Sequence, residues 1–326
     1  MTYDAITSAY SRISSTIRRT PLLNSPLLDE IAGRQIWAKA ECLQQTGSFK
    51  FRGAMSAITS LSAEQAKSGV VAFSSGNHAQ GVALAARMND IPAVIIMPSD
   101  APKVKIENTR KYGAEVVLYD RATQDRDEIG AKISQDRGLE LIKPFDDFRV
   151  IAGQGTVGLE IAEQAAENNA TLGATLVCCG GAGLTSGIAL AMAETAPSTT
   201  VFPVEPEGFD DVARSLASGQ HETNDTTSGG LCDAIITPTP GQLTLPILLK
   251  HCPRGLVISE EQALMAMRLA FEYLRVVVEP GGAVALAAAI YHNASLPEGP
   301  IAAVLSGGNV DIDIFQRALN TELVLP

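Results

Sequence analysis

No stretch of this sequence stays apolar over the ~18 residues that a membrane-spanning helix requires. Residues 1–12 include acidic and polar residues where a secretory signal would carry its apolar core. A basic face for nucleic acid or anionic membranes is also lacking, since 25 Lys and Arg oppose 36 Asp and Glu and the formal charge is −11. These partners are therefore excluded, and any anionic ligand must be held by locally placed donors.

Cysteine usage gives no sign of disulfides or of a zinc site. The chain has five cysteines, none in CxxC spacing. Cys178 and Cys179 are adjacent in an apolar run, which favours buried, reduced thiols. We therefore expect a cytoplasmic protein. The composition, with 46% hydrophobic and 19% charged residues, is that of an ordinary globular protein.

Short β-branched runs alternate with amphipathic stretches through most of the chain. This alternation predicts an α/β fold with mostly parallel sheets covered by helices, in two compact lobes. Strands are expected at 69–73, 92–97, 114–119, 174–179, 200–204 and 301–305, and helices at 78–88, 103–112, 124–136 and from Leu184. A capping-box pattern at Ser259 predicts one more helix, with one face in the core: Leu264, Met267, Phe271 and Leu274.

The segment Thr46–Ala54 places Lys50 between Phe49 and Phe51, where irregular chain gives way to a helix. Packing around the stem would desolvate the amine and lower its pKa, which favours the neutral nucleophile of Schiff-base chemistry. Taken alone, the segment is more simply explained by an ordinary surface lysine of a helix.

Two further motifs follow predicted strands. Ser74–Gly81 opens a helix after the first of them, so its amides and hydroxyls could hold an anion such as a carboxylate. Leu305–Asn309 follows the last strand, where the Ser306 hydroxyl could bond a neutral pyridine nitrogen. Simple capping turns without a ligand are the alternative at both places.

The run Gly180–Gly187 lies between a predicted strand and a helix, and its backbone N–H groups suit a phosphate. A nicotinamide-dependent oxidoreductase is the rival interpretation. Gly181 and Gly183 begin a dinucleotide fingerprint, and Glu205 stands where a ribose-binding acid would sit. The fingerprint requires its third glycine at position 186, where this chain has Ser186. Gly187 comes one residue too late, which counts against the dinucleotide interpretation.

Together these motifs, with Ile151–Thr156 and Glu279–Val284, resemble the fold-type II pyridoxal-phosphate enzymes over essentially the whole chain. The match is to their serine/threonine dehydratase and serine racemase branch. The resemblance implies the tryptophan synthase β-like α/β fold, with two open, twisted, mostly parallel sheets flanked by helices. It implies a large cofactor-binding domain from 1–47 and 148–326, a small substrate-side domain from 48–147, and a homodimer.

The resemblance also assigns roles to matching residues. Lys50 would form the Schiff base with the cofactor and act as the base at Cα, and Ser75 would be the acid/base on the opposite face. The other implied cofactor contacts are Phe49, Asn77, Gly180, Gly181, Ala182, Gly183, Leu184, Glu279 and Ser306. The substrate would lie against Ser74, Ser75, Gly76, His78 and Thr239. Ala182 replaces a glycine of the family pattern, which is tolerable if its φ is negative.

A divalent cation, Mg²⁺ or Ca²⁺, is implied at the acidic segment Glu205–Asp211. Its ligands would be the carboxylates of Glu205 and Asp211 and the backbone oxygen of Phe209, because these hard ions prefer oxygen ligands. A solvated acidic turn without a metal is the alternative.

The implied reaction is β-elimination from a small hydroxy-amino acid such as L-serine or L-threonine, giving a 2-oxo acid and ammonia. The resemblance leaves 3-hydroxyaspartate dehydration and serine racemisation open. For the β-carboxylate of hydroxyaspartate, Lys132 and Arg149 are candidate cations by sequence position. Because the sequence ends at Pro326, without room for the regulatory domain of longer threonine deaminases, isoleucine feedback is not expected. A non-catalytic amino-acid-binding relative is a further alternative.

Overall fold

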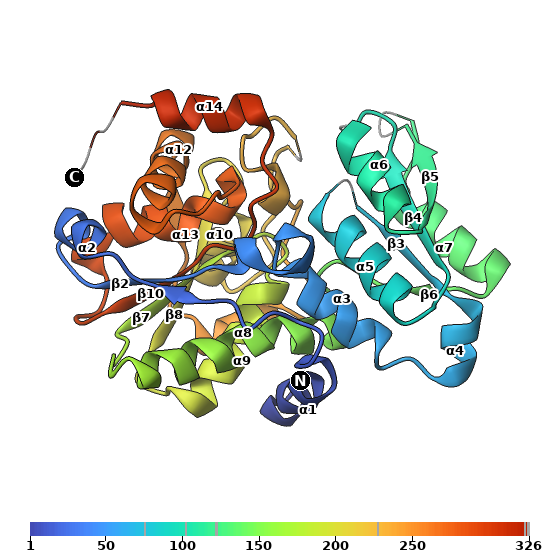
Figure 1. The fold of residues 1–326 in the computed structure, drawn as a ribbon, viewed down its shortest axis with the longest axis horizontal. Helices are drawn as coiled ribbons and strands as arrows, with labels where there is room; N and C mark the ends of the chain where they lie inside the picture. The colour runs from blue at the N-terminus through green and yellow to red at the C-terminus, as the bar shows by residue number, and fades with distance from the viewer. Residues whose placement is uncertain (75, 102, 121–122, 227, 323, 325–326) are drawn as a thin grey trace.

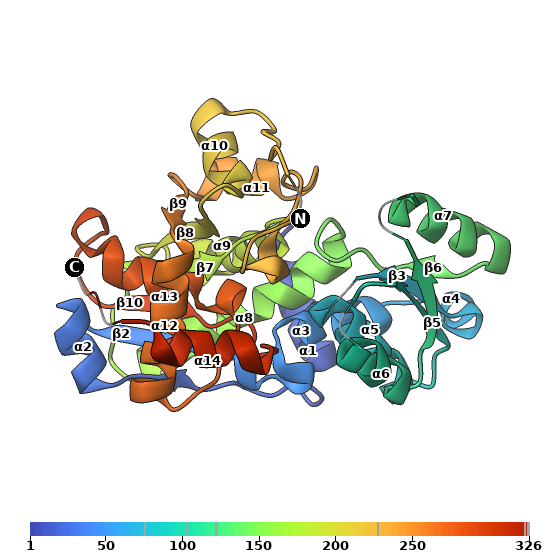
Figure 2. The same cartoon turned by 90° about the horizontal axis from the view of Figure 1, so that it is seen from above.

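The computed structural model describes residues 1–74, 76–101, 103–120, 123–226, 228–322 and 324. Two sheets lie side by side, the smaller one with α4–α7 on the right of Figure 1 and also in the view from above in Figure 2. In the described part of the chain, no helix is long and apolar enough to cross a membrane.

The large sheet has strand order β1-β2-β10-β7-β8-β9, and all its pairs are parallel except β1 with β2. Its strands come from both ends of the chain: β1 (Leu22–Leu23), β2 (Ile36–Lys39), β7 (Ala174–Cys178), β8 (Thr200–Pro206), β9 (Leu256–Ile258) and β10 (Ile301–Val304). Its helices are α1 (Tyr3–Ile13), α2 (Pro26–Ala32), α8 (Phe148–Glu167), α9 (Gly183–Thr195), α10 (Asp211–Ser218), α11 (Leu245–His251), α12 (Glu260–Leu269), α13 (Pro280–Tyr291) and α14 (Ile312–Asn320).

The small sheet has order β5-β4-β3-β6 and is entirely parallel. It consists of β3 (Val70–Phe73), β4 (Ala93–Pro98), β5 (Glu115–Tyr119) and β6 (Glu140–Leu141). Its helices are α3 (Lys50–Ile58), α4 (Ala63–Ser68), α5 (Asn77–Met88), α6 (Lys103–Lys111) and α7 (Arg126–Arg137). Short helices η1 (Glu41–Leu43), η2 (Gln45–Gly47), η3 (Asp233–Ile235), η4 (Ala270–Leu274) and η5 (Asn293–Ser295) complete the chain.

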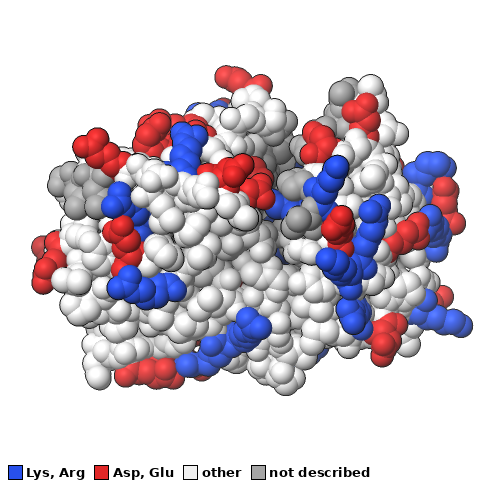
Figure 3. All heavy atoms as spheres, turned by 45° about the horizontal axis from the view of Figure 1, so that its top comes forward, with Lys and Arg blue, Asp and Glu red and all other residues white. Residues whose placement is uncertain are grey.

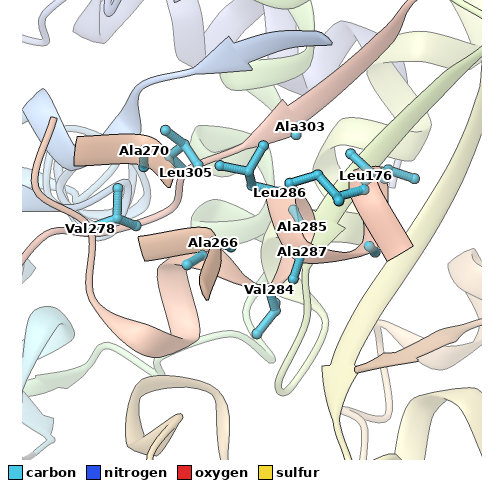
Figure 4. Packing of buried hydrophobic residues seen from close by; sticks show 14 of the residues in the cluster. Leu176, Ala266, Ala270, Val278, Val284, Ala285, Leu286, Ala287, Ala303 and Leu305 are labelled. Atoms are coloured by element: carbon cyan, nitrogen blue, oxygen red, sulfur yellow. The ribbon is translucent and has the colours of Figure 1, made fainter. Parts of the chain in front are cut away.

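The central strands of each sheet, among them β10, β7 and β3, are buried on both faces, as near-continuous apolar strands require. Alternate residues of the large sheet pack on α12 and α13 on one face and on α8 and α9 on the other. Figure 4 shows α13 at the centre of the first of these layers, where its Leu286 lies beside Leu176 and Ala303 of the strands. In the small sheet, α3 and α5 cover one face and α7 covers the other.

The α/β class and the two mostly parallel sheets are confirmed. The domain boundaries at 47 and 148 stay a prediction, although the strands of the small sheet all fall within 70–141. One core residue was predicted wrongly. Leu264, Met267 and Leu274 are buried, but Phe271 is 40% exposed because the helix widens into the π-helical turn η4, and its ring contacts Phe315.

Candidate active site

A cavity lies between the two sheets, where the loops after β3 and β7 face each other. Such a crevice at the carboxyl ends of parallel strands is the usual ligand position in α/β proteins. The residues that line it are Phe49, Lys50, Phe73, Ser74, Gly76, Asn77, His78, Lys105, Arg126, Pro144, Phe145, Cys178, Gly180, Gly181, Ala182, Gly183, Leu184, Asp233, Ala234, Ile235, Ile236, Thr237 and Glu279.

Lys50 is the first residue of α3, and its amine faces this cavity. Nζ donates to the carbonyl oxygen of Pro144 at 2.9 Å and lies 5.2 Å from the centroid of the Phe49 ring. Burial lowers the pKa of Lys50 to about 8, since the charged form loses water. A substantial fraction of the amine is therefore neutral near physiological pH and able to act as a nucleophile.

Asn77 begins α5 directly opposite the loop that leads into α13. Its Nδ2 donates to Oε1 of Glu279 at 2.6 Å. Burial raises the pKa of Glu279 to about 7, because the carboxylate is held away from solvent. The side chains of Asn77 and Glu279 thus form one polar wall of the cavity, which the sequence motifs predicted as two separate contacts.

The glycine run after β7 forms the wall facing Asn77. Ala182 precedes the first residue of α9 in a left-handed conformation, with φ +68°. Because the first N–H groups of a helix have no acceptor within it, the amides that follow Ala182 are free to hold an anion. We expected an alanine to fit here if its φ were negative, but the φ of Ala182 is positive. The alanine is therefore accommodated with backbone strain.

The glycines of this run also allow other segments of the chain to approach the loop closely. A Cβ on Gly181 would lie 2.3 Å from the Phe145 ring, and one on Gly180 would lie 2.7 Å from the carbonyl oxygen of Ile235. Phe145 therefore covers one side of the loop, and its neighbour Pro144 accepts the hydrogen bond from Lys50. A segment that sequence motifs did not single out closes the cavity.

The dinucleotide interpretation fails at two residues. A Cβ on Gly187 would lie 2.5 Å from the backbone of α8, so this glycine allows two helices to pack. Glu205 does not line the cavity. Its carboxylate instead accepts the backbone N–H groups of Val212 and Ala213 at 3.1 and 2.7 Å, at the start of α10.

Ser306 follows β10 and is buried beside the Lys50 loop. Its carbonyl oxygen accepts the N–H of Phe49 at 3.0 Å, and a bridge joins Ser48 to Gly307. The Cys178 thiol, at the end of the strand that leads to the glycine run, donates to the carbonyl oxygens of Val304 and Gly282 at 3.2 and 3.3 Å. Two motifs from opposite ends of the chain are thus brought together, although Ser306 itself does not line the cavity.

The predicted substrate side is assembled around Ser74 and His78. Ser74 Oγ accepts the N–H of Gly76 at 3.1 Å. His78 is buried with Nε2 at 3.0 Å from the carbonyl oxygen of Ile142, and Nδ1 has no partner in the described part of the chain. Burial, followed by the charge of Lys50, lowers the pKa of His78 to about 3. The ring is therefore neutral, with its proton on Nε2.

The other two predicted substrate contacts are Ser75 and Thr239. Ser75, the predicted opposite-face acid/base, lies outside the described residues. Thr239 donates its hydroxyl to the carbonyl oxygen of Glu222 at 2.9 Å, and Thr237 lines the cavity in its place.

With this arrangement in view, comparison with known proteins identifies the family. Residues 13–307 match the family described as "Pyridoxal-phosphate dependent enzyme". The chain belongs to this family.

Relatives of known name resemble it along their length. The chain is 42% identical to a serine racemase of Arabidopsis thaliana, covering 94% of this chain and 93% of the relative. It is 40% identical to an L-threo-3-hydroxyaspartate ammonia-lyase of Saccharomyces cerevisiae, covering 98% and 96%. An L-threonine ammonia-lyase of Thermotoga maritima is 39% identical, covering 99% and 79%.

Solved structures give the same answer. A threonine deaminase from T.th. matches with a TM-score of 0.90 at 44% identity, covering 96% of this chain and 99% of that one. Maize serine racemase matches with a TM-score of 0.91 at 36% identity, covering 98% and 96%. The fold-type II resemblance is confirmed, and the protein is a pyridoxal-phosphate enzyme.

The residues of the cavity fit this cofactor. Its phosphate requires several amide donors, its ring an apolar contact and its aldehyde a neutral amine. The glycine run, the Phe49 ring and the Lys50 amine offer these groups around one cavity.

The predicted cation ligands lie together, away from the cavity. Burial, followed by the charge of Asp211, raises the pKa of Glu205 well above its usual range. Asp211 Oδ1 accepts the Asn224 amide at 2.6 Å, whereas Oδ2 is buried without a partner in the described part of the chain. Across those residues no group of three or more His, Cys, Asp or Glu side chains could hold a metal.

The cations predicted to face the substrate lie elsewhere. Lys132 is exposed and donates to Asp136 at 2.8 Å. Arg149 is paired with Asp147 and Glu140 at 2.6 and 2.7 Å.

Two cations that sequence motifs missed line the cavity instead. Lys105 of α6 lies 3.9 Å from Asp233, and the Arg126 guanidinium of α7 lies 5.4 Å from the centroid of the Phe73 ring. Neither residue belongs to one of the sequence motifs described above. Only the packing of α6 and α7 in the folded protein shows that they reach the cavity.

Proposed function

We propose that this enzyme removes water from a small β-hydroxy-amino acid and releases a 2-oxo acid and ammonia. The observation that carries the proposal is the buried amine of Lys50, whose pKa is lowered to about 8, in a cavity shared with the glycine run and Asn77. The names of the relatives, which include ammonia-lyases for threonine and hydroxyaspartate, support the same reaction.

Bound pyridoxal phosphate supplies an electron sink that acidifies the proton on Cα of the substrate. In our proposal Lys50 accepts that proton at Nζ while the β-hydroxyl group departs. The Cα proton and the hydroxyl group together amount to one water molecule, and a water molecule then hydrolyses the released imine to the 2-oxo acid and ammonia. By the family resemblance, the Ser306 hydroxyl rather than a charged partner would meet the ring nitrogen, which would leave that nitrogen neutral. Neutral His78 and the N-terminus of α5 would face the substrate, and the first amides of this helix, which have no acceptor within it, would hold the substrate carboxylate.

The test is a 2-oxo acid assay with L-serine, L-threonine and both diastereomers of 3-hydroxyaspartate. Lys50→Ala should abolish product formation and the yellow colour of the purified enzyme, because the cofactor loses its covalent anchor. Lys67→Ala, an exposed lysine of α4, is the matched control and should retain both. A Lys50→Ala variant that remains yellow and active would contradict the proposal.

A dicarboxylic substrate of the 3-hydroxyaspartate type is the second candidate. It is favoured by Lys105 and Arg126, two cations that the small-sheet helices contribute to the cavity. If Arg126 binds the β-carboxylate, Arg126→Met should raise KM for threo-3-hydroxyaspartate by about tenfold or more, the effect of losing a charge-assisted hydrogen bond. KM for L-serine should remain within about twofold. Equal losses for both substrates would exclude this role, and exposed Arg137→Met is the control.

Serine racemisation is a further candidate, because the family resemblance makes Ser75 the acid/base on the face of the substrate opposite Lys50. We infer that Ser75→Ala spares elimination from an L-substrate and suppresses activity toward the D-enantiomer. Equal loss of both activities would refute the opposite-face role.

We also propose a Mg²⁺ or Ca²⁺ ion at Glu205, Asp211 and the backbone oxygen of Phe209. The unpartnered, buried Oδ2 of Asp211 and the raised pKa values of the two carboxyl groups support it, because a cation would satisfy both.

A cytoplasmic homodimer is the remaining part of the proposal. The free cysteines, all buried, are consistent with a reducing compartment. On the α14 edge Phe271 is 40% exposed and Ile312 is 74% exposed, which suits a second copy of the chain. On the face in Figure 3, acidic and basic side chains are interspersed. Light scattering that gives the monomer mass would refute the dimer.

A further inference from the structure

The amide of Asn309 connects the turn before Lys50 to the wall of the cavity. Its Nδ2 donates to the carbonyl oxygen of Thr46 at 2.8 Å and to Oδ1 of Asn77 at 2.7 Å. Asn77 in turn donates from its own Nδ2 to Glu279 at 2.6 Å. One row of hydrogen bonds thus joins four loops that are far apart in the sequence.

The direction of this row is fixed at one end. A backbone carbonyl can only accept, so the group of Asn309 that faces Thr46 must be its NH₂. The same NH₂ meets the Asn77 oxygen, which turns the NH₂ of Asn77 toward Glu279. The orientation of the Asn77 amide therefore follows from its neighbours, although the O and N atoms of an isolated amide are nearly interchangeable in shape.

This orientation matters because Asn77 lines the cavity. Of the two hydrogens on its Nδ2, Glu279 takes one, and the second can be donated to a ligand. The reverse orientation would turn the Asn77 oxygen toward the Glu279 carboxylate. A phenolic oxygen that carries negative charge needs a donor, and the reverse orientation would set an acceptor in its place.

The turn before Lys50 is shaped to admit Asn309. Gly47 has φ +74°, a left-handed conformation that favours glycine. A Cβ at this position would lie 2.6 Å from Oδ1 of Asn309. Glycine at position 47 is thus required both by the backbone conformation and by the close approach of this side chain.

We propose that Asn309 is a positioning residue that sets the orientation of the Asn77 amide, so that Asn77 presents a donor to the ring oxygen of pyridoxal phosphate. The inference rests on the proposed placement of the cofactor against Asn77. Asn309 touches neither cofactor nor substrate and acts only through Asn77.

The test compares Asn309→Asp, Asn77→Ala and the double variant as purified holoenzymes. Asn309→Asp keeps the size of the side chain but replaces its NH₂ by an oxygen, which would face the acceptor atoms of Thr46 and Asn77. We expect a shifted visible absorption band and a dissociation constant for pyridoxal phosphate raised about tenfold, as expected for one lost charge-assisted hydrogen bond. The double variant should resemble Asn77→Ala, because the two residues act in series.

Asn293→Asp is the matched control. Asn293 is also half-buried and donates its amide to a backbone carbonyl, that of Ala32 at 2.5 Å, but it does not line the cavity. This variant should keep the wild-type band and dissociation constant. Melting curves of all variants separate loss of structure from loss of positioning, since a structural effect alone would shift Tm and leave the absorption band in place.

The outcomes distinguish the inference from the proposed function. A wild-type band and affinity in Asn309→Asp, with both altered in Asn77→Ala, would overturn the role of Asn309 and leave the placement of the cofactor intact. An unaltered band in Asn77→Ala would overturn the placement against Asn77 and the inference with it. The function itself is tested separately by Lys50→Ala.

Discussion

Ala182 lies in the glycine run directly before α9 and carries a side chain where the backbone conformation favours glycine. Its φ of +68° lies in the left-handed region, which costs an alanine about 1–2 kcal/mol. The strain is maintained because Gly181 and Gly183 on either side are packed against Phe145. The strain at Ala182 therefore lowers the free energy of unfolding relative to a glycine in the same conformation.

Ala182→Gly should relieve this strain. After subtraction of about 0.4–1 kcal/mol for the greater freedom of glycine in the unfolded chain, we expect a gain of about 0.5–1 kcal/mol in the free energy of unfolding. Urea denaturation measures it. Ala131→Gly, at an exposed helical position of α7, is the control and should lose about 1 kcal/mol. Equal losses in both variants would contradict the strain at Ala182.

At the level of residues, the sequence predicted which loops form the site better than which side chains enter it. Lys50 and Asn77 were identified because each begins a helix beside a recognisable motif. Lys105 and Arg126 were missed in favour of Lys132 and Arg149, because the face of a helix that meets the cavity depends on how the two sheets pack. That arrangement is not encoded in local spacing.

The helix α3, which begins at Lys50, is held by a buried ionic cluster. Arg52 donates to Glu41 at 2.7 and 2.8 Å and to Glu160 of α8 at 2.8 Å, with its side chain fully buried. Lys39 of β2 donates to the same Glu160 at 2.6 Å. The start of α3 is thereby fixed to the large sheet.

Removing the arginine would leave two buried carboxylates short of a partner. Arg52→Met should lower the free energy of unfolding by about 3–5 kcal/mol, the usual effect of breaking a buried ion pair from one side. Arg19→Met serves as the control, because its exposed pairs with Glu163 and Glu167 should contribute less than about 1 kcal/mol. Chemical denaturation of both variants checks the difference, and similar values would contradict a stabilising cluster.

Elements with strong periodicity were predicted to within about two residues, as the bounds of β3, α5, β4 and α7 show. The π-helical turn η4 was not predicted, because the apolar spacing of Leu264–Leu274 fits an ordinary helix. Thr237 lines the cavity in place of Thr239 because the loop that carries both is irregular, so no periodicity indicates which side chain turns inward.

On the scale of the whole molecule, the predicted cation site lies on the large sheet, at the junction of β8 and α10. A bound ion would stabilise the folded state by mass action, since the unfolded chain does not hold the carboxylates together. Treatment with EDTA should lower Tm by several degrees, and Mg²⁺ or Ca²⁺ should restore it. Asp211→Asn should lose this response. An unchanged Tm after complete removal of metal would exclude the site.

The strand order of the large sheet has a consequence for biosynthesis. β10 lies between β2 and β7, although residues 301–304 are translated long after either neighbour. On the ribosome the edges of β2 and β7 remain unpaired until β10 emerges, and Asn309 cannot reach Asn77 earlier. The cavity is therefore completed only late in synthesis, and until β10 is inserted the facing edges of β2 and β7 are open strand edges of the kind that promotes aggregation.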